Sequence, residues 1–412
     1  MKALGVRHTK IACYTGYVTQ AIIVNFAPLL FVTFNTQYNI SLTLIGTMIT
    51  VNFGMQLLID LLSSKFVDKI GYRPCMVAAH LFAGGGLLLL AFLPDVLPVP
   101  AVGLFIASAV YAVGGGLIEV LVSPVIEACP SENKKSEMGL LHSFYSWGLV
   151  AVVALSTLYF VLAGIENWQI LACVWAAVPF LNAVCFLFVP LFKPVEEGKG
   201  MSVGALLKSR MFWLFVLLML CAGSCENAVS QWASAFAESG LKVSKTLGDL
   251  LGPCLFAVCM GISRVLFAKF GAKLHIKPAL MISAAGCVGG YALCAFAPQS
   301  AAWLGLVGCG IVGFCVSIMW PGTLSFASAT IPKGGTALFA LLALAGDVGC
   351  MSGPSAVGAI ADGFGGSIQA GIAFGIFFPV VMFVAVALYR EKKRAAASEE
   401  ENDGDDAGKT EQ

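Results

Sequence analysis

Charge is the scarcest property of this sequence. Asp, Glu, Lys and Arg together make up 11% of the 412 residues, about half the share of an ordinary soluble domain. Motifs for chemistry are missing too: the 14 cysteines stand singly without a CxxC pair, and neither a P-loop nor a nucleophile elbow is present. We therefore expect no enzyme, no cofactor and no resident metal. The net charge of +1 gives no reason to expect a nucleic-acid partner.

Apolar residues make up 58% of the chain, more than a soluble protein of this length hides from water. A bilayer accommodates such segments when each is helical, because a helix satisfies its own backbone hydrogen bonds. About twenty residues span the hydrocarbon layer. Punctuation by turns and charges predicts twelve membrane helices, at residues 11–34, 42–63, 74–93, 100–126, 138–162, 168–192, 211–232, 250–268, 278–297, 301–328, 334–360 and 367–389.

The first apolar run follows Lys2, Arg7 and Lys10, as the apolar core of a signal peptide would. It is longer than such a core and has no small-residue cleavage site. We therefore expect it to remain in the protein as a membrane helix.

Basic residues are distributed unevenly over the predicted loops. With the N-terminus placed in the cytoplasm, 22 of the 24 Lys and Arg residues lie on the inside, and Lys242 and Lys245 lie outside. Such an asymmetry predicts orientation, because basic loops stay cytoplasmic. We expect a multi-pass protein of the plasma (inner) membrane with both termini in the cytoplasm.

A long polar break separates the first six predicted helices from the last six. We expect an N-terminal bundle at 1–192, a cytoplasmic linker at 193–209, a C-terminal bundle at 210–390 and a disordered acidic tail at 391–412. The halves echo one another, since "DKIGYR" at 68–73 aligns with "AKFGAK" at 268–273. Duplicated halves are typical of alternating-access carriers.

The stretch "FVDKIGYRP" at 66–74 resembles the motif between helices two and three of the major facilitator superfamily, G-x-x-x-D-x-x-G-x-R. Asp68, Gly71 and Arg73 match, whereas Ser64 replaces the first glycine. Gly71 suits a tight reversal of the chain. The resemblance covers essentially the whole chain and implies an all-α membrane protein with twelve helices in two pseudo-symmetric six-helix bundles.

In that family, the acid of the motif is thought to latch the cytoplasmic gate against the start of helix eleven. A helix N-terminus attracts an anion, and "IPKGG" at 331–335 supplies one beside Lys333. The resemblance thus implies that Asp68 stabilises the outward-open state, with Gly71, Arg73 and Lys333 as further gating residues. The alternative is that the motif only anchors the topology. Arg264 lies near the inner end of predicted helix eight, where its long side chain can reach the membrane surface, and is expected to be a gating charge.

A narrower resemblance lies in helix four. "IEVLVSP" at 118–124 is similar to the E-T-x-x-N-P signature of fucose–proton symporters and related sugar permeases, with Glu119 and Pro124 matching and Ser123 in place of Asn. The symporters' helix-one carboxylate has no counterpart here, where Gln20 and Asn25 are the conspicuous polar residues. The resemblance implies a sugar, with fucose itself and a two-carboxylate relay in doubt.

Ionisable side chains inside a membrane cost at least about 2.5–3.5 kcal/mol, so each calls for a reason. Glu119 is expected to carry a proton or to contact the solute; the alternative is a permanently protonated or hydrogen-bonded carboxyl. Glu226 lies in "GSCENAVSQWAS", where amides, a hydroxyl and an indole suit a polyol. The alternative for Glu226 is interhelical hydrogen bonding. Asp347 either lines the cavity or forms a structural pair.

Three polar residues of helix two recur every four positions and share one face. Asn52 and Gln56 are expected to contact the solute, and Asp60, nearer the surface, to act in the gate or in packing. The candidate solute-binding residues are Gln20, Asn25, Asn52, Gln56, Glu226, Asn227, Gln231 and Trp232, and the candidate proton-coupling residues are Glu119, Glu226 and Asp347.

These observations predict a monomeric secondary transporter that takes up a small hydrophilic solute, a sugar in the first place, together with a proton. The rival within transport is a drug or metabolite exporter, which would depend weakly on Asn52 and Gln56. A nutrient sensor that transports nothing is the alternative of another class. It would need a folded signalling domain, and the acidic tail is too short to form one.

Overall fold

The structure is a computed structural model that describes residues 5–130, 134–192, 201, 203–270, 274–331 and 334–389. Every regular element in this part of the chain is helical. Twelve helices or helix pairs are long and apolar enough to cross a membrane, which confirms the predicted fold class. They extend over 21 to 32 residues, or about 32–48 Å at 1.5 Å per residue.

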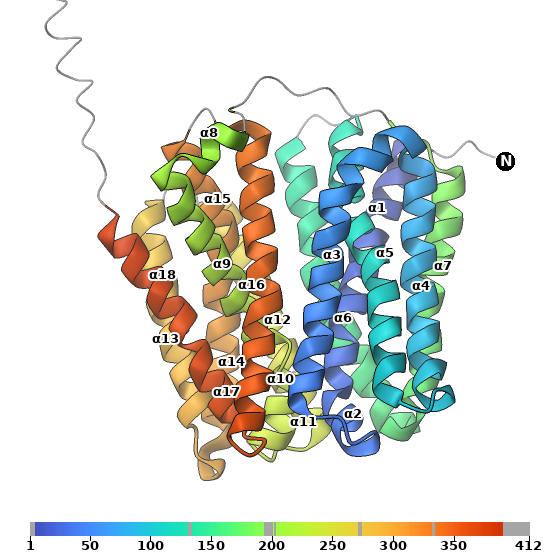
Figure 1. Ribbon diagram of the computed structural model, residues 1–412, viewed down its shortest axis with the longest axis vertical. Helices are drawn as coiled ribbons and strands as arrows, with labels where there is room; N and C mark the ends of the chain where they lie inside the picture. The colour runs from blue at the N-terminus through green and yellow to red at the C-terminus, as the bar shows by residue number, and fades with distance from the viewer. Residues whose placement is uncertain are drawn as a thin grey trace, which may run out of the picture.

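The first six spanning units contact chiefly one another and form the first bundle (Figure 1). It consists of α1 (Val6–Asn25), η1 (Ala27–Leu30), α2 (Phe31–Gln37), α3 (Leu42–Ile70), α4 (Tyr72–Val96), α5 (Pro100–Ala128), α6 (Lys134–Ala163), η2 (Ile165–Asn167) and α7 (Trp168–Phe188).

The second bundle comprises the remaining spanning units. Its elements are α8 (Val203–Leu207), α9 (Arg210–Ser230), α10 (Ala233–Ala235), η3 (Phe236–Gly240), α11 (Lys245–Asp249), η4 (Leu250–Cys254), α12 (Leu255–Phe270), α13 (Ile276–Phe296), η6 (Gln299–Ala301), α14 (Ala302–Val316), α15 (Met319–Thr330), α16 (Gly335–Gly363), α17 (Ile368–Gly375) and α18 (Phe377–Leu388).

The bundles meet most extensively through α3 and α16, and a second contact joins α6 to α11, η4 and α12. We call the end where α1 starts and α3 stops the linker end, and the opposite end the distal end. Figure 1, with the linker end at the top, shows α3 and α16 converging toward the distal end.

The first predicted span and the predicted loop between the second and third spans differ from the structure. The first span is interrupted by a short 3₁₀ turn at Ala27–Leu30, because Pro28 has no backbone N–H to continue the helix. The predicted loop around Asp68 does not exist: α3 runs through Ile70 and α4 begins at Tyr72, so Gly71 alone breaks the helix, with φ of 96°. Asp68 therefore lies on the last turn of a helix.

The seventh and eighth spans also differ from the prediction. Residues 231–254 hold the short helix α10 and two π-helical turns, Phe236–Gly240 and Leu250–Cys254. The eighth span starts at Lys245, five residues before the predicted start. Lys245 and Asp249 consequently belong to a helix at the bundle interface, whereas the sequence placed them in an outer loop.

Candidate functional site

Three amide side chains form a chain of hydrogen bonds inside the first bundle. Gln20 Nε2 of α1 donates to Gln56 Oε1 of α3 over 2.7 Å, and Gln56 Nε2 donates to Asn52 Oδ1 over 3.0 Å. Gln20 Nε2 also lies 3.5 Å from Glu119 Oε2 of α5. The four-residue spacing on α3 produces this alignment, since positions i and i+4 share a helix face.

Three carboxyl groups converge next to these amides, two from the first bundle and one from the second. Asp60 lies near enough to Glu119 for their charges to interact, and Asp347 of α16 interacts with both. Glu119 is exposed, although Gln20 and both acids surround it. Solvent therefore reaches Glu119 between the bundles.

A second polar group bridges the bundles. Arg264 Nη1 of α12 donates to Ser146 Oγ of α6 over 3.0 Å, and Arg264 Nη2 lies 3.7 Å from Glu226 Oε2 of α9. Asn25 Nδ2 donates to the hydroxyl of Tyr145, one residue before Ser146, over 3.3 Å. Arg264 thus extends toward Glu226 and the other bundle, whereas the sequence placed it near the membrane surface.

The remaining candidate solute-binding residues face protein groups in this conformation. Asn227 Nδ2 donates to Cys350 Sγ over 3.0 Å. The Trp232 indole is fully buried and packs against Phe31 of the other bundle, with ring centroids 5.3 Å apart. Gln231 is 2% exposed, and its Nε2 has no hydrogen-bond partner within the described structure.

Arg73 forms its hydrogen bonds within its own bundle. Its guanidinium donates to the carbonyl oxygens of Phe186, Leu187 and Val189 over 2.8, 2.6 and 2.8 Å. These carbonyls lie at the C-terminus of α7, where a cation is favourable. Arg73 therefore fastens the start of α4 to the end of α7.

Of the other predicted gating residues, the structure describes Gly71 in full, at the linker end. Gly71 supplies the positive φ between α3 and α4. The side chain of Asp68 and the whole of Lys333 lie outside the described residues, as does part of the second motif copy at 268–273. The cytoplasmic latch stays a prediction.

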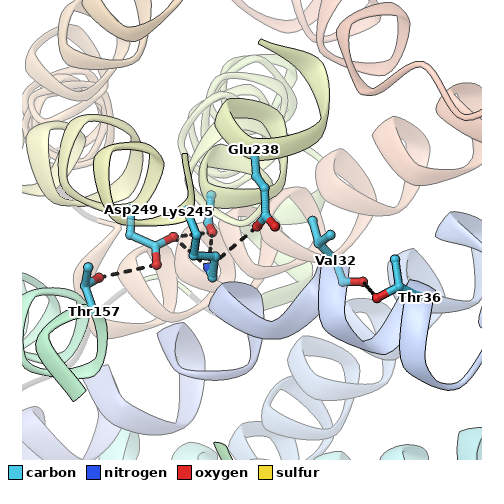
Figure 2. Close-up of polar contacts among 7 residues, drawn as sticks. Val32, Thr36, Thr157, Glu238, Lys245 and Asp249 are labelled. Atoms are coloured by element: carbon cyan, nitrogen blue, oxygen red, sulfur yellow. Dashed lines mark hydrogen bonds and ion pairs between the residues drawn. The ribbon is translucent and has the colours of Figure 1, made fainter. Parts of the chain in front are cut away.

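A buried charge cluster that sequence reasoning missed joins the bundles at the distal end (Figure 2). Asp249 is 0% exposed. Its Oδ1 accepts hydrogen bonds from Ser234 Oγ and, over 2.8 Å, from Lys245 Nζ. Its Oδ2 accepts one from Thr157 Oγ1 of the first bundle over 3.3 Å. Lys245 also lies 3.9 Å from Glu238 Oε2.

A signal for this cluster was present in the sequence. Lys245 and Asp249 are four residues apart, the spacing of an ion pair on one helix face. Because the apolar run begins only at residue 250, the pair was assigned to a loop. The π turns around it are visible only in the structure.

Replacing Asp249 with alanine should destabilise the protein by about 1.5–3 kcal/mol, because the partly buried Lys245 ammonium then loses its hydrogen-bonded carboxylate and keeps only Glu238, 3.9 Å away. Thermal unfolding in detergent measures the change. Asp95→Ala is the matched control. Asp95 is exposed and accepts hydrogen bonds from Tyr38 and Gln169 within one bundle, so its loss should cost less than about 1 kcal/mol. Equal losses in the two variants would contradict a special role of the buried pair.

Glu238 makes the stability of this region dependent on pH. Burial raises the pKa of its carboxyl above the ordinary 4.5, although Lys245 opposes the shift. The folded state then binds the proton more tightly, so the contribution of Glu238 to stability is fully present below about pH 4.5 and is lost as the pH rises through the folded-state pKa. Glu238→Gln should flatten this part of the profile of unfolding temperature against pH, and parallel profiles would show the expectation to be wrong.

The central residues form one polar region between the bundles, with four carboxyl groups, one guanidinium and several amides. Within the described residues, no group of three or more His, Cys, Asp or Glu side chains is arranged to hold a metal ion. The arrangement instead supplies hydrogen-bond donors and acceptors to a small polar solute, and carboxyls able to exchange protons with solvent.

Comparisons with known proteins agree with this architecture. The family model described as Major Facilitator Superfamily matches residues 13–354. Crystal structures of the nucleoside transporter NupG share the fold: that of a single-residue mutant superposes with a TM-score of 0.74 at 15% identity, covering 93% of this chain and 100% of that one. A second NupG structure gives 0.72 at 14% identity, covering 93% and 99%. No curated protein sequence matches.

The family match spans most of the chain, and the structure has twelve candidate membrane spans within the described residues. The protein belongs to the Major Facilitator Superfamily, a family of membrane transporters.

Proposed function

We propose that this protein takes up a small hydrophilic solute, a sugar in the first place, together with a proton, by alternating access across the plasma membrane. The observation that carries the proposal is the polar region between the bundles. It combines the amides of Gln20 and Gln56 with the carboxyls of Glu119 and Glu226 and the guanidinium of Arg264. A sugar needs such closely spaced donors and acceptors.

Two buried amide atoms of the candidate solute-binding residues support a polar ligand. Gln20 Oε1 and Gln231 Nε2 lack hydrogen-bond partners among the described residues, although both side chains are at least 95% buried. An unpaired buried amide is unfavourable, and hydroxyl groups of a solute would satisfy both atoms. In this proposal Asn25, Asn52, Asn227 and Trp232 contribute to the binding site in the course of the transport cycle.

Proton coupling is proposed from the excess of acidic groups. Asp60, Glu119 and Asp347 lie within electrostatic reach of one another, and Arg264 is already paired with Glu226. Neighbouring ionised carboxylates repel one another, and binding of a proton to one of them removes the repulsion. Exposed Glu119 is the group that exchanges the proton with solvent.

The orientation follows from charge. The predicted loops at the linker end carry most of the basic residues, and Lys242 and Lys245 lie toward the distal end. By the positive-inside rule, the linker end and both termini then lie in the cytoplasm. We propose separately that the transporting unit is a monomer.

Counterflow in proteoliposomes tests the function. Vesicles loaded with an unlabelled sugar should accumulate the same labelled sugar in a saturable way. The panel should include nucleosides, because NupG is described as a nucleoside transporter, and hydrophobic cationic drugs for the exporter alternative. Exchange restricted to the drugs would reject the proposal, and exchange of nucleosides alone would replace the sugar by a nucleoside.

A further inference from the structure

The N-terminus of α3 is capped by the other bundle. The first four N–H groups of an α-helix, counted from the N-cap residue, have no partner within it. Asp362, near the end of α16, accepts hydrogen bonds from Leu42 N over 3.1 Å and from Thr43 N over 2.6 Å. Ser41 Oγ accepts the third, from Leu44 N over 3.2 Å. Two of these N–H groups of α3, those of Leu42 and Thr43, are thus satisfied by a carboxylate on a different bundle.

The two helices approach one another closely enough for this contact because glycines face each other one turn away. A Cβ on Gly358 would lie 2.7 Å from the carbonyl oxygen of Leu42 and 3.3 Å from Gly46 Cα. One turn further in, Ser355 Oγ donates to the carbonyl oxygen of Gly46 over 3.1 Å and is hydrogen-bonded to Thr50. Small residues three or four positions apart on each helix, Gly46 and Thr50 on α3 and Ser355 and Gly358 on α16, therefore line the contact between the two helices; we call this contact the glycine seam.

We propose that Asp362 is a latch that holds the distal end closed while the linker end is open. This inference rests on the alternating-access function proposed above. The carboxylate favours the N-terminus of α3 for two reasons: it accepts two hydrogen bonds, and its charge complements the positive end of the helix dipole. When the bundles part at this end, the contact is lost and water must replace it.

The same two helices carry the predicted cytoplasmic latch at their opposite ends. Asp68 lies on the last turn of α3, and α16 begins at Gly335. A stiff helix pair that converges at one end separates at the other, so the Asp362 contact and the contact predicted for Asp68 would exclude one another. Asp362 and Asp68 then bias a single equilibrium in opposite directions.

Hydrogen exchange of the full-length protein in lipid nanodiscs tests the proposal without any solute. In Asp362→Asn, peptides containing Leu42 and Thr43 should exchange at least about tenfold faster. A tenfold change corresponds to about 1.4 kcal/mol, the size expected for the loss of the charged contact with the helix N-terminus. Peptides at the linker ends of α3 and α16, such as 55–63 and 338–346, should exchange more slowly as that end closes. This reciprocal protection distinguishes a latch from a local helix cap.

Asp95→Asn is the matched control, since Asp95 lies at the same end and accepts hydrogen bonds only from residues of its own bundle in the described structure. It should leave exchange at both ends unchanged. Asp68→Asn should shift exchange in the opposite direction, and the double variant with Asp362→Asn should return toward the unmodified protein.

Faster exchange at Leu42 and Thr43 without slower exchange at the linker end would overturn the latch, and so would unchanged exchange at both ends. The counterflow assay is separate from these readouts. Reciprocal exchange with no transported sugar would therefore reject the proposed solute and leave the latch standing.

Discussion

Glu119→Gln is expected to reduce proton-driven accumulation of the solute to the level of protein-free liposomes. The amide keeps the size and most hydrogen-bonding capacity of the carboxyl, including a contact with Gln20, 3.5 Å away, but it binds no proton. A carrier whose coupling carboxyl is lost no longer converts a pH gradient into a solute gradient. Uptake of labelled solute with and without an imposed pH gradient measures this change.

Counterflow separates coupling from binding in the same variant. Exchange of labelled for unlabelled solute needs no net proton movement, so Glu119→Gln should retain it. Glu166→Gln provides the chemical control, because Glu166 is an exposed residue of the η2 turn and should retain both activities. Accumulation by Glu119→Gln that still follows the pH gradient would assign the proton to another group, whereas loss of counterflow would make Glu119 a solute contact.

Gly349→Val is expected to prevent most of the protein from folding. A Cβ at this position of α16 would overlap the carbonyl oxygen of Leu220 on α9 and would lie 2.9 Å from Ser224 N. These are backbone atoms, which cannot move aside as a side chain can. The helices must separate, which we expect to cost at least about 3 kcal/mol, the upper range for overpacking.

Fluorescence-detected size-exclusion chromatography of the expressed variant measures the loss as a fall in the monodisperse peak. Gly289→Val is the matched control, since Gly289 also lies within a membrane helix, α13, and an added Cβ there meets nothing within 4 Å. Similar yields of both variants would show that α9 and α16 tolerate separation at Gly349. In that case the close contact is not needed for the fold.

The candidate site was predictable in part. The spacing of Asn52, Gln56 and Asp60 indicated one polar face, and the structure brings that face to Gln20 and Glu119. Local spacing carries such information because a helix repeats every 3.6 residues. The partners of Glu226 and Arg73 were not predictable, because they come from elements distant in the sequence.

The sequence by itself determined the number and nature of the membrane helices. Each apolar run satisfies its own backbone in hydrocarbon, so its length and composition suffice. The sequence also determined where the acidic residues lie along those helices, but not which groups they contact.

Only the tertiary structure decided which polar groups meet across the bundles. Asp249 accepts a hydrogen bond from Thr157 of the first bundle. Asp362 caps the N-terminus of α3 through Leu42, 320 residues away in the sequence. Both contacts depend on how closely the two bundles approach, and the glycine seam sets that approach for α3 and α16. No local sequence pattern specifies these contacts, because they depend on how the surfaces of α3, α6, α12 and α16 pack against one another.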